Sequence, residues 1–446
     1  MQAEERIDEL LRTGRGVTID SRTALPGEVF FAIRGDAFDG NRFAAAALEK
    51  GCTAAVVENE TWAREDERYI AVPDGLKALQ QAAHRYRMSW SFPVIALTGS
   101  NGKTTTKELM RNVLASTFNV AATVGNFNNE IGVPLTLLRM PVDLDYAIVE
   151  MGANAQGEIR ELVEIARPDF ALITNIGHAH LEGFGGIDGV KKGKSEIYSR
   201  MRADGTGHAF VNAKHAVLQE VSEGLDRTLY GTQEALPAVR RSGGHFETFE
   251  WQDAEDPGTW RGPVPCALEG EHNLENVATA LAVGRYFGVP AAAAEQAIAN
   301  YRPTNNRSEW RTTERNQILL DAYNANPSSM LATLAYFGEA IATREGWSQA
   351  LIVLGEMGEL GEHSAAGHEA VTRAAAELGE DLPGEVILVG KAYAQALQTV
   401  ATPPNVLCFP VTQDASAWIA QSRPSDCIIL LKGSRTASLE TLLPLL

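Results

Sequence analysis

The sequence predicts an α/β protein of more than one domain, as its length and a repeated alternation of strands with helices indicate. The chain has 446 residues, and a domain usually holds about 100–200 residues, so we expect more than one hydrophobic core. Hydrophobic residues make up 45% of the chain and charged residues 22%, a balance typical of folded globular proteins. Strands that alternate with helices along a chain form mainly parallel sheets.

The first 91 residues predict a small α/β unit. Ile7, Leu10 and Leu11 recur at helical spacing near its start. An Ala-rich stretch at 43–50 predicts a further helix, and short β-rich runs bounded by turn residues predict strands around it. These runs are GVTIDSR, EVFFAIRG, CTAAVVEN and RYIAVP. We expect the unit to end near Ser91.

Residues 92–301 predict a second unit, built around a parallel sheet. The buried strands PVIALTG, YAIVEMG and FALITNIG alternate with helical stretches, of which KTTTKELMRNVLAST is the first. This alternation is typical of nucleotide-binding architectures. Residues 232–262 mix Gly, Pro, charged and aromatic residues without a clear period, so we expect a peripheral hairpin or loop there.

A third unit is predicted over residues 302–446. The Pro- and Asn-rich stretch YRPTNNRSEW follows a helical segment and suits a linker, which places a boundary near Tyr301. After it, QILLD, ALIVLGE, EVILVG and CIILLKG predict strands that alternate with helices. This pattern predicts a second doubly wound α/β domain.

Charge and cysteine content narrow the classes of partner and compartment. Asp and Glu number 57 against 39 Lys and Arg, a formal net charge of −18, which argues against nucleic acid or an anionic membrane as the main partner. The acidic start has no apolar signal segment, and other apolar runs are of strand length, so we expect a soluble cytoplasmic protein without membrane insertion. Four scattered cysteines predict buried thiols in a reducing compartment and no zinc site. They are Cys52, Cys266, Cys408 and Cys427.

The segment VIALTGSNGKTTTKELM at 94–110 carries the sharpest chemical signal. It predicts a buried strand, a tight Gly turn and a helix that opens at Lys103, an arrangement that binds phosphate through backbone N–H groups. In such a P-loop the lysine reaches the β- and γ-phosphates and the next hydroxyl, here Thr104, binds Mg²⁺. The longer GxxxxGK[ST] pattern is not met, because Leu97 stands at its first Gly position. The alternative is an ordinary Gly-containing turn between a strand and a helix.

Polar residues follow two further strands of the same sheet, where ligands of open α/β sheets bind. Glu150 ends YAIVEMG, and Asn175, His178, His180 and Glu182 follow FALIT. A carboxylate at such a strand end suits Mg²⁺, although a solvated strand end explains Glu150 equally well. His180 by itself favours a structural hydrogen bond, since Mg²⁺ rarely takes imidazole.

Three weaker features stand elsewhere in the chain. The lysines of GVKKGKSEIYS (189–199), taken alone, predict a solvated basic helix face. Asn273 and Asn276 share one helix face, where their amides could read an adenine edge or cap the helix. Asp321 ends the strand QILLD before an Asn/Pro loop, and it could hold a ribose hydroxyl.

Taken together, a series of segments in one order across nearly the whole chain resembles a known family. The segments are TGSNGKTTT (98–106), GNFNNEIGVP (125–134), VEMGANAQGEI (149–159), TNIGHAHLEGFG (174–185), KSEI (194–197), GEHNLENVATA (270–280), DAYNANPSSM (321–330), LGEMGELG (354–361) and LLKGSR (430–435). They look like those of the ATP-dependent Mur ligases. The N-terminal IDSRTALPGEVFFAIRGDAFDGNRF (19–43) is similar to the UDP-binding start of family members that act on UDP-muramoyl peptides.

The resemblance implies a three-domain architecture and a ligation reaction. Residues 1–91 would form a small α/β UDP-muramoyl substrate-binding domain, 92–301 a central P-loop ATP-binding domain, and 302–446 a Rossmann-like domain that closes over the site. DAYNANP, LGEMGELG and KGSR, without a DNPR-like segment, resemble the members that join D-alanyl-D-alanine to UDP-muramoyl-tripeptide in peptidoglycan precursor synthesis. There, ATP phosphorylates the tripeptide carboxylate and the dipeptide amine displaces phosphate. The family expectation is a monomer.

The resemblance also implies residue roles. Lys103, His180 and Lys194 would be catalytic, and Lys194, matched through KSEI, would be carbamylated, which makes an ammonium an anionic ligand. The metal set for Mg²⁺ would be Thr104, Glu150, His180 and Lys194. ATP would be bound by Gly99, Ser100, Asn101, Gly102, Lys103, Thr104, Thr105, Asn273, Asn276, Arg307, Asp321 and Tyr323. The peptide substrates would be bound by Ser21, Arg22, Asn128, Lys432, Ser434 and Arg435.

Other functions compete with this interpretation. The nearest is a ligase that adds the third amino acid to a UDP-muramoyl dipeptide. A folylpolyglutamate-type ligase is disfavoured by the N-terminal unit that contains DSR. From a different class, a P-loop regulatory ATPase would hydrolyse ATP without needing an amine acceptor. A UDP-sugar binding protein without catalysis gives no use for Lys103, Thr104 and Glu150 together.

Overall fold

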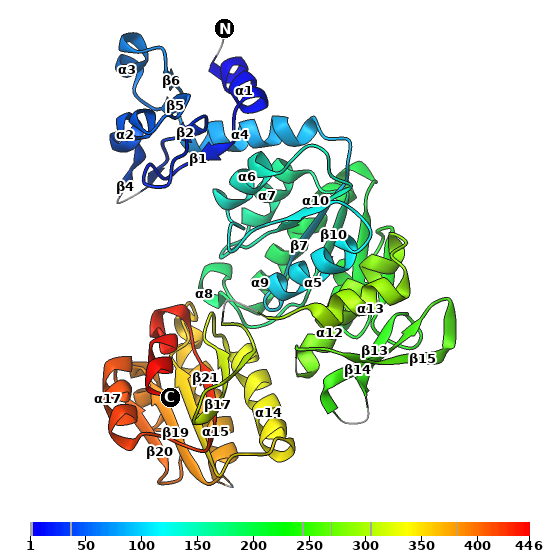
Figure 1. The fold of residues 1–446 in the computed structure, drawn as a ribbon, viewed down its shortest axis with the longest axis vertical. Helices are drawn as coiled ribbons and strands as arrows, with labels where there is room; N and C mark the ends of the chain where they lie inside the picture. The colour runs from blue at the N-terminus through cyan, green and yellow to red at the C-terminus, as the bar shows by residue number, and fades with distance from the viewer. Residues whose placement is uncertain (1–2, 36–37, 243–244, 269, 304–305, 381) are drawn as a thin grey trace.

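The computed structural model describes residues 3–446 except 36–37, 243–244, 269, 304–305 and 381. Over these residues the chain forms three larger sheets that follow one another along the sequence and are flanked by helices. We call the parts built around them the N-terminal, central and C-terminal domains (Figure 1). The limits at 91/92 and 301/302 stay predictions. Among the described residues, no helix combines the length and apolar character that crossing a bilayer requires.

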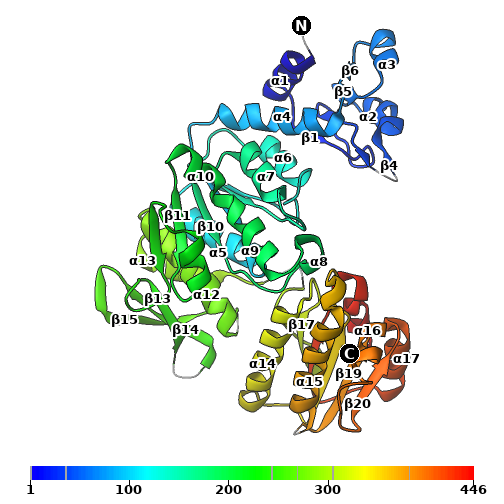
Figure 2. The same cartoon turned by 180° about the vertical axis from the view of Figure 1, so that it is seen from behind.

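The N-terminal domain has a four-stranded parallel sheet in the order β1-β2-β5-β6. Its long helix α4 packs against α6 and α7 of the central domain and so joins the two domains (Figures 1 and 2). The elements are α1 (Ala3–Thr13), β1 (Val17–Thr18), β2 (Val29–Phe31), β3 (Arg34–Gly35), β4 (Phe38–Asp39), η1 (Gly40–Phe43), α2 (Ala44–Glu49), β5 (Ala54–Val57), α3 (Glu60–Glu65), β6 (Tyr69–Ala71) and α4 (Gly75–Met88).

The central domain has a six-stranded parallel sheet in the order β12-β11-β10-β7-β9-β8. Ile95 and Leu97 of β7 belong to the core under α5 and α12, whereas Val94 and Ala96 belong to the core under α4, α6 and α7. Both faces are thus buried, which explains the unbroken apolar run of this strand. The elements are β7 (Val94–Thr98), α5 (Lys103–Ala115), β8 (Val120–Ala122), α6 (Gly132–Arg139), β9 (Tyr146–Glu150), α7 (Glu158–Ala166), β10 (Phe170–Ile173), α8 (Leu181–Phe184), α9 (Ile187–Ser195), η2 (Glu196–Tyr198), α10 (Ser199–Asp204), β11 (His208–Asn212), α11 (Ala216–Val221), β12 (Arg227–Tyr230), α12 (Glu271–Tyr286) and α13 (Ala291–Asn300).

The segment 232–262, predicted as a peripheral hairpin or loop, is more regular than expected. It belongs to an antiparallel three-stranded sheet of β13 (Ala238–Ser242), β14 (His245–Asp253) and β15 (Asp256–Pro265) that packs on α12 and α13. Phe249 and Trp251 alternate inward on β14 and are fully buried, which ties the sheet to the central core. Residues 243–244 lie outside the described residues. The Gly and Pro residues of the flanking strands hid this alternation from the sequence pattern.

The C-terminal domain has a six-stranded sheet in the order β16-β17-β21-β18-β19-β20, parallel except for the edge strand β16. The predicted strands are present and alternate with helices, whereas β16, β20 and α17 were not predicted. The elements are β16 (Glu309–Thr312), β17 (Asn316–Asp321), α14 (Pro327–Thr343), β18 (Gln349–Gly355), η3 (Gly361–His363), α15 (Ser364–Glu380), β19 (Gly384–Val389), α16 (Lys391–Ala396), β20 (Val406–Phe409), α17 (Thr412–Ser422), β21 (Cys427–Lys432), η4 (Arg435–Ala437) and η5 (Leu439–Leu445).

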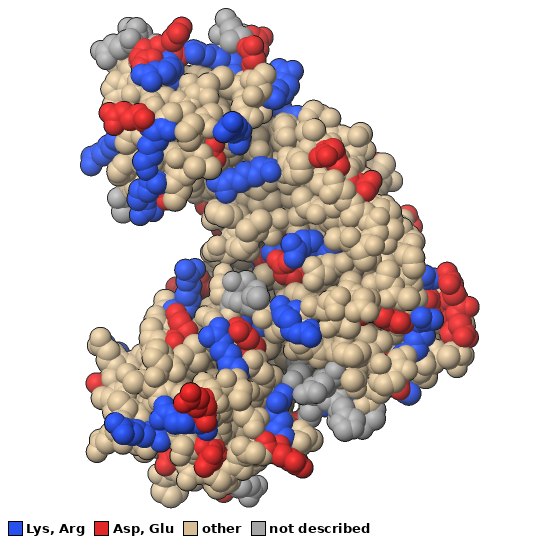
Figure 3. All heavy atoms as spheres, viewed as in Figure 1, with Lys and Arg blue, Asp and Glu red and all other residues tan. Residues whose placement is uncertain are grey.

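The three domains form a bent arrangement. The C-terminal domain meets the central domain beside α8 and α12, and the N-terminal domain lies at the far end of the central domain (Figures 1 and 2). Figure 3 shows a deep hollow between the N-terminal and C-terminal lobes, with Lys and Arg side chains on both rims. Of the four cysteines, all free, Cys408 is half-buried and the others are buried.

Candidate active site

A cavity of about 730 Å³ lies between the central and C-terminal domains. Its central wall is made by the loops that follow β7, β9 and β10, at the carboxyl edge of the parallel sheet, where such folds bind ligands. Most of the predicted site residues meet there. Those lining the cavity are Ser100, Asn101, Gly102, Lys103, Thr104, Thr105, Asn128, Glu150, His180, Asn273, Asn276, Arg307, Asp321, Tyr323, Lys432, Ser434 and Arg435.

The turn between β7 and α5 has the backbone of a phosphate-binding loop. Gly102 precedes α5 with φ 77°, and no side chain caps this helix, so its first N–H groups are available to an anion. Gly99 has φ 147°, and a Cβ there would lie 2.0 Å from Oγ1 of Thr174. Only glycine fits that position.

Lys103 curls back over this loop. Its Nζ donates to the carbonyl oxygens of Gly99 at 2.6 Å and Ser100 at 3.2 Å. Burial lowers the pKa of Lys103 to about 8, while Glu150 opposes the shift. The half-buried ammonium lines the cavity, where a phosphate would be a strong partner.

Glu150 holds one carboxylate oxygen in hydrogen bonds beside this loop and the other near a buried ammonium. Oε1 accepts the Thr104 hydroxyl at 3.2 Å and the Asn128 amide at 2.8 Å. The buried Oε2 has no hydrogen-bond donor and lies 3.7 Å from the Lys107 ammonium. A buried carboxylate oxygen without a donor, beside a hydroxyl, fits Mg²⁺, which prefers oxygen ligands. Over the described residues, no group of three or more His, Cys, Asp and Glu side chains gathers as a metal site.

Lys194 and His180 have different surroundings. Lys194 is fully buried, does not line the cavity, and donates to the Ala153 carbonyl at 3.0 Å. Burial, and then the charge of Lys103, lowers the pKa of Lys194 well below its usual value. His180 lines the cavity and pairs through Nδ1 with Glu359 of the C-terminal domain. A hydrogen bond from His180 lowers the pKa of Glu359.

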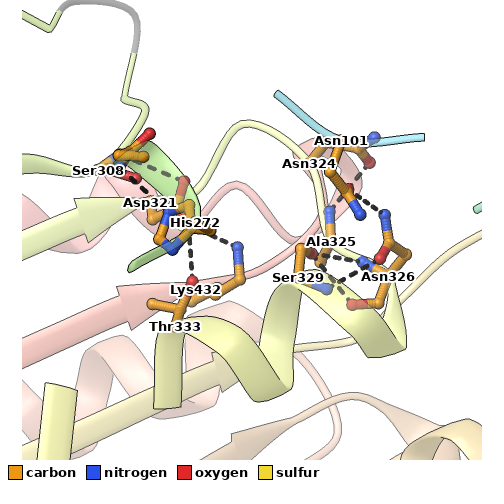
Figure 4. Close-up of polar contacts among 11 residues, drawn as sticks. Asn101, His272, Ser308, Asp321, Asn324, Ala325, Asn326, Ser329, Thr333 and Lys432 are labelled. Atoms are coloured by element: carbon orange, nitrogen blue, oxygen red, sulfur yellow. Dashed lines mark hydrogen bonds and ion pairs between the residues drawn. The ribbon is translucent and has the colours of Figure 1, made fainter. Parts of the chain in front are cut away.

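The C-terminal wall holds an ion pair at the ends of two neighbouring strands. Nζ of Lys432, the last residue of β21, lies 2.6 Å from Oδ2 of Asp321, the last residue of β17. Thr333 donates to the same oxygen at 3.1 Å. Burial raises the pKa of Asp321, but Lys432 and these hydrogen bonds hold it below its usual value. Figure 4 shows this cluster with His272 of the central domain beside it.

Two other predicted nucleotide contacts have defined surroundings. The Arg307 guanidinium stacks 3.8 Å from the Tyr323 ring centroid, which makes one flat surface of the two side chains. Asn276 accepts the Thr106 hydroxyl at 2.9 Å and donates to Asn273 at 2.9 Å. The Asn276 amide therefore connects α12 with the first turn of α5.

The cavity does not include every predicted residue. Gly99, Lys194, Ser21 and Arg22 are absent from its lining. Ser21 is buried in the N-terminal domain, whereas Arg22 is exposed and forms a bidentate pair with Asp20. This pair and the backbone hydrogen bond of Arg22 lower the pKa of Asp20 to about 2.

Several polar residues at the cavity were not predicted from the sequence. Lys107 contacts Glu150, His272 and Glu359 line the cavity, and Ser328 and Asn326 reach the phosphate-binding side from the C-terminal domain. Four of them lie inside segments that resemble the family, and Lys107 directly follows the segment 98–106. A polar residue next to assigned ones in such a segment was the only signal that could have found them.

Three family models match the chain and together span most of it. They are described as "Mur ligase family, catalytic domain" over residues 14–87, "Mur ligase middle domain" over 97–284 and "Mur ligase, glutamate ligase domain" over 306–435. Each match falls on one of the three larger sheets.

Relatives and solved structures match this chain over nearly its whole length. A UDP-N-acetylmuramoyl-tripeptide--D-alanyl-D-alanine ligase of Bacillus subtilis is 32% identical over 95% of this chain and 91% of its own length. A crystal structure of MurF from Acinetobacter baumannii is 29% identical, with a TM-score of 0.84 over 98% of this chain and 97% of that one. A MurF ligase from Thermotoga maritima in complex with ADP is 26% identical, with a TM-score of 0.82 over 98% and 97%.

Proposed function

The chain belongs to the Mur ligase family, and we propose that it joins D-alanyl-D-alanine to UDP-N-acetylmuramoyl-tripeptide at the expense of ATP. The relatives with this name match nearly the whole chain, and a related structure holds ADP. The product would be the UDP-muramoyl-pentapeptide precursor of peptidoglycan. We also propose a cytoplasmic location, since free, mostly buried thiols suit a reducing compartment.

One observation carries this proposal furthest. A single cavity has a phosphate-binding loop with Lys103 on its central wall and the exposed Arg435 on its C-terminal wall. Cations on both walls suit a reaction that brings ATP and two anionic substrates together in a protein of net charge −18. A ligase needs such a meeting point, whereas a simple ATPase does not.

The reaction needs an activated carboxylate, because a free carboxylate is a poor electrophile. An oxygen of the tripeptide carboxylate attacks the γ-phosphorus of ATP, and ADP leaves. The dipeptide amine then attacks the acyl carbon, and phosphate leaves. Lys103 and the start of α5 would hold the transferring phosphoryl group, which is catalysed mainly by positioning and charge neutralisation. The docked C-terminal domain would keep water from the acyl phosphate.

We propose Thr104 and Glu150 as protein ligands of Mg²⁺, with His180 and a carbamylated Lys194 nearby. Bound there, Mg²⁺ would offset charge on the phosphate oxygens. The contact of Glu150 with the Thr104 hydroxyl at the cavity supports its part, because it brings two oxygen ligands together. The lowered pKa of Lys194 supports a neutral amine able to take up CO₂, because burial and Lys103 disfavour its ammonium form. Asn273, Asn276, Arg307, Asp321 and Tyr323 would surround the nucleotide.

Phosphate release tests this function. Purified protein with ATP and Mg²⁺ receives UDP-muramoyl-tripeptide and D-alanyl-D-alanine separately and together, and mass spectrometry follows the products. Lysine and diaminopimelate forms of the tripeptide are both offered. We expect release, and a pentapeptide product, only when both peptides are present. Lys103→Met should lower the rate by at least about 100-fold, since it removes a charge that contacts the transferred group.

The rival functions give different results. Release that ignores both peptides would mark a regulatory ATPase and overturn the ligase. Product formed from UDP-muramoyl dipeptide and a single amino acid would mark the preceding ligase of the pathway.

A further inference from the structure

The amide of Asn326 connects the C-terminal domain to the phosphate-binding loop. Asn326 precedes α14, and it is 4% exposed. Its Nδ2 donates at 2.7 Å to Oδ1 of Asn101, the loop residue before Gly102. The two residues are 225 positions apart in the chain, and Figure 4 shows their side chains facing each other across the domain boundary.

The helix start dictates how this amide is oriented. Oδ1 of Asn326 accepts the backbone N–H of Ser329 at 3.0 Å. In return, the Ser329 hydroxyl oxygen accepts the backbone N–H of Asn326 at 3.1 Å, so the two residues form a capping box. The amide oxygen is therefore committed to α14, which leaves only the nitrogen for the other domain. A nitrogen there requires an oxygen from Asn101, as observed.

The backbone of Asn101 is held by the central domain. Its backbone N–H donates to Oδ1 of Asn175 at 3.0 Å. Its carbonyl oxygen accepts the Thr174 hydroxyl at 2.6 Å and the Asn175 amide at 3.0 Å. Its side-chain oxygen has its donor in the C-terminal domain, and that donor is present only when the domains are docked.

A second contact joins the same surfaces. The hydroxyl of Ser328, two residues after Asn326, lies 3.2 Å from Nδ1 of His178 and accepts the His178 backbone N–H at 3.3 Å. The start of α14 therefore touches two of the loops of the central wall, those that follow β7 and β10. The ion pair of Arg241 with Glu339, with 2.9 Å between Nη2 and Oε2, also joins the two domains, but it touches neither loop.

We propose that Asn326 is a positioning residue: it orders Asn101 of the phosphate-binding loop only while the C-terminal domain is docked, so that docking and nucleotide binding favour one another. Such coupling is reciprocal by thermodynamic necessity. This inference rests on the nucleotide site of the proposed function. Bound nucleotide should therefore stabilise the docked C-terminal domain, and docking should raise the affinity for nucleotide.

A double-mutant cycle in the full-length protein tests the coupling. Asn326→Ser keeps an N-cap acceptor for α14 but is too short to reach Asn101, and Asn101→Ala removes the acceptor. Calorimetric titration with ADP and Mg²⁺ should show each variant binding about five-fold more weakly, the effect of one neutral hydrogen bond. The double variant should also be about five-fold weaker. Glu339→Gln is the matched control at the other interdomain contact and should change the affinity by less than about two-fold.

Hydrogen exchange distinguishes this role from a purely structural one, because a structural role of Asn326 would not make the exchange rate depend on ADP. ADP should slow exchange of residues 324–329 in the wild-type protein and not in Asn101→Ala. A double variant about 25-fold weaker, the product of two independent five-fold losses, would mean that Asn101 acts without Asn326 and would overturn the inference. A wild-type protein that binds no ADP would instead overturn the proposed function, and the inference with it.

Discussion

Lys194 is the residue whose proposed chemistry differs most from that of an ordinary lysine. It is fully buried, and its pKa is lowered well below the usual value by burial and by Lys103. We predict that it forms a carbamate with CO₂. NMR with ¹³C-labelled bicarbonate should detect a carbamate carbon in the wild-type protein and none in Lys194→Arg. The ligase activity of this variant should fall by about 10- to 100-fold, which is the usual loss when a residue that supports a metal site is changed.

Lys192 offers the control for that experiment. It lies on the same helix, α9, but is exposed, so Lys192→Arg should keep both the carbamate signal and the activity. A carbamate signal that persists in Lys194→Arg would assign the modification to another lysine.

Gly99 shows how one residue shapes the phosphate-binding loop. An alanine there would place its Cβ 2.0 Å from the Thr174 hydroxyl oxygen at φ 147°. We predict that Gly99→Ala lowers stability by about 3 kcal/mol, because backbone strain and overpacking add. Gly205→Ala is the control, since φ is 64° and no atom lies within 4 Å of its Cβ. It should cost about 1 kcal/mol. Calorimetric unfolding of both variants measures the difference, and equal losses would contradict the predicted clash.

At the scale of elements, the parallel pairing of β17 with β21 sets the charge of the C-terminal wall. The register places Asp321 opposite Lys432, so the ends of two strands that are distant in sequence form one ion pair. The sheet thereby holds Lys432 at the cavity, where Asp321 compensates its charge.

This pair predicts a pH dependence of stability. The pKa of Asp321 is lower in the folded protein than its usual value, against the effect of burial, chiefly because of Lys432. The folded state therefore favours the ionised form. Its contribution is complete above pH of about 4, the usual pKa of Asp, and is lost as the pH falls through the lower folded value. Asp321→Asn should lower stability by about 3 kcal/mol at neutral pH.

Urea unfolding at a series of pH values checks this prediction. The difference in unfolding free energy between wild type and Asp321→Asn should shrink as the pH falls below about 4. A difference that stays constant with pH would show that the stabilisation comes from packing and not from the charge of Asp321.

At the scale of the whole molecule, the proposed substrate contacts are divided between distant lobes. Ser21 and Arg22 belong to the N-terminal domain and do not line the cavity, whereas Lys432, Ser434 and Arg435 do. Figure 3 shows the hollow that separates the two lobes. One substrate that contacts both sets of residues has to bridge this hollow, or the lobes have to approach each other.

We predict that the lobes approach each other. Small-angle scattering should show a smaller radius of gyration when UDP-muramoyl-tripeptide and ADP are both bound than with neither. Arg22→Ala should weaken the effect of the UDP substrate and leave the effect of ADP alone intact, because Arg22 lies far from the proposed nucleotide site. An unchanged radius would mean that the substrate spans a static hollow.

Sequence patterns alone predicted the parts of this protein that depend on neighbours in the chain. The strand, Gly turn and helix around Lys103 were predicted and are present, because hydrophobic runs, glycines and helix starts act within a few residues. The convergence of loops after β7, β9 and β10 was also expected, since parallel strands place their carboxyl ends at one edge. The strands β8, β11, β12, β16 and β20 were missed, because they are short and do not stand in a run that pairs a clear apolar stretch with turn residues on both sides.

Only the tertiary structure decided which polar groups meet across the chain. No local pattern connects Asn326 with Asn101 or Lys107 with Glu150, or shows that Asn276 supports α5. The sequence by itself determined which segment forms the Gly turn before α5 and which segments fold into sheets, because these properties are local. The packing of one domain on another decided which partners those segments find, because such contacts depend on geometry summed over hundreds of residues.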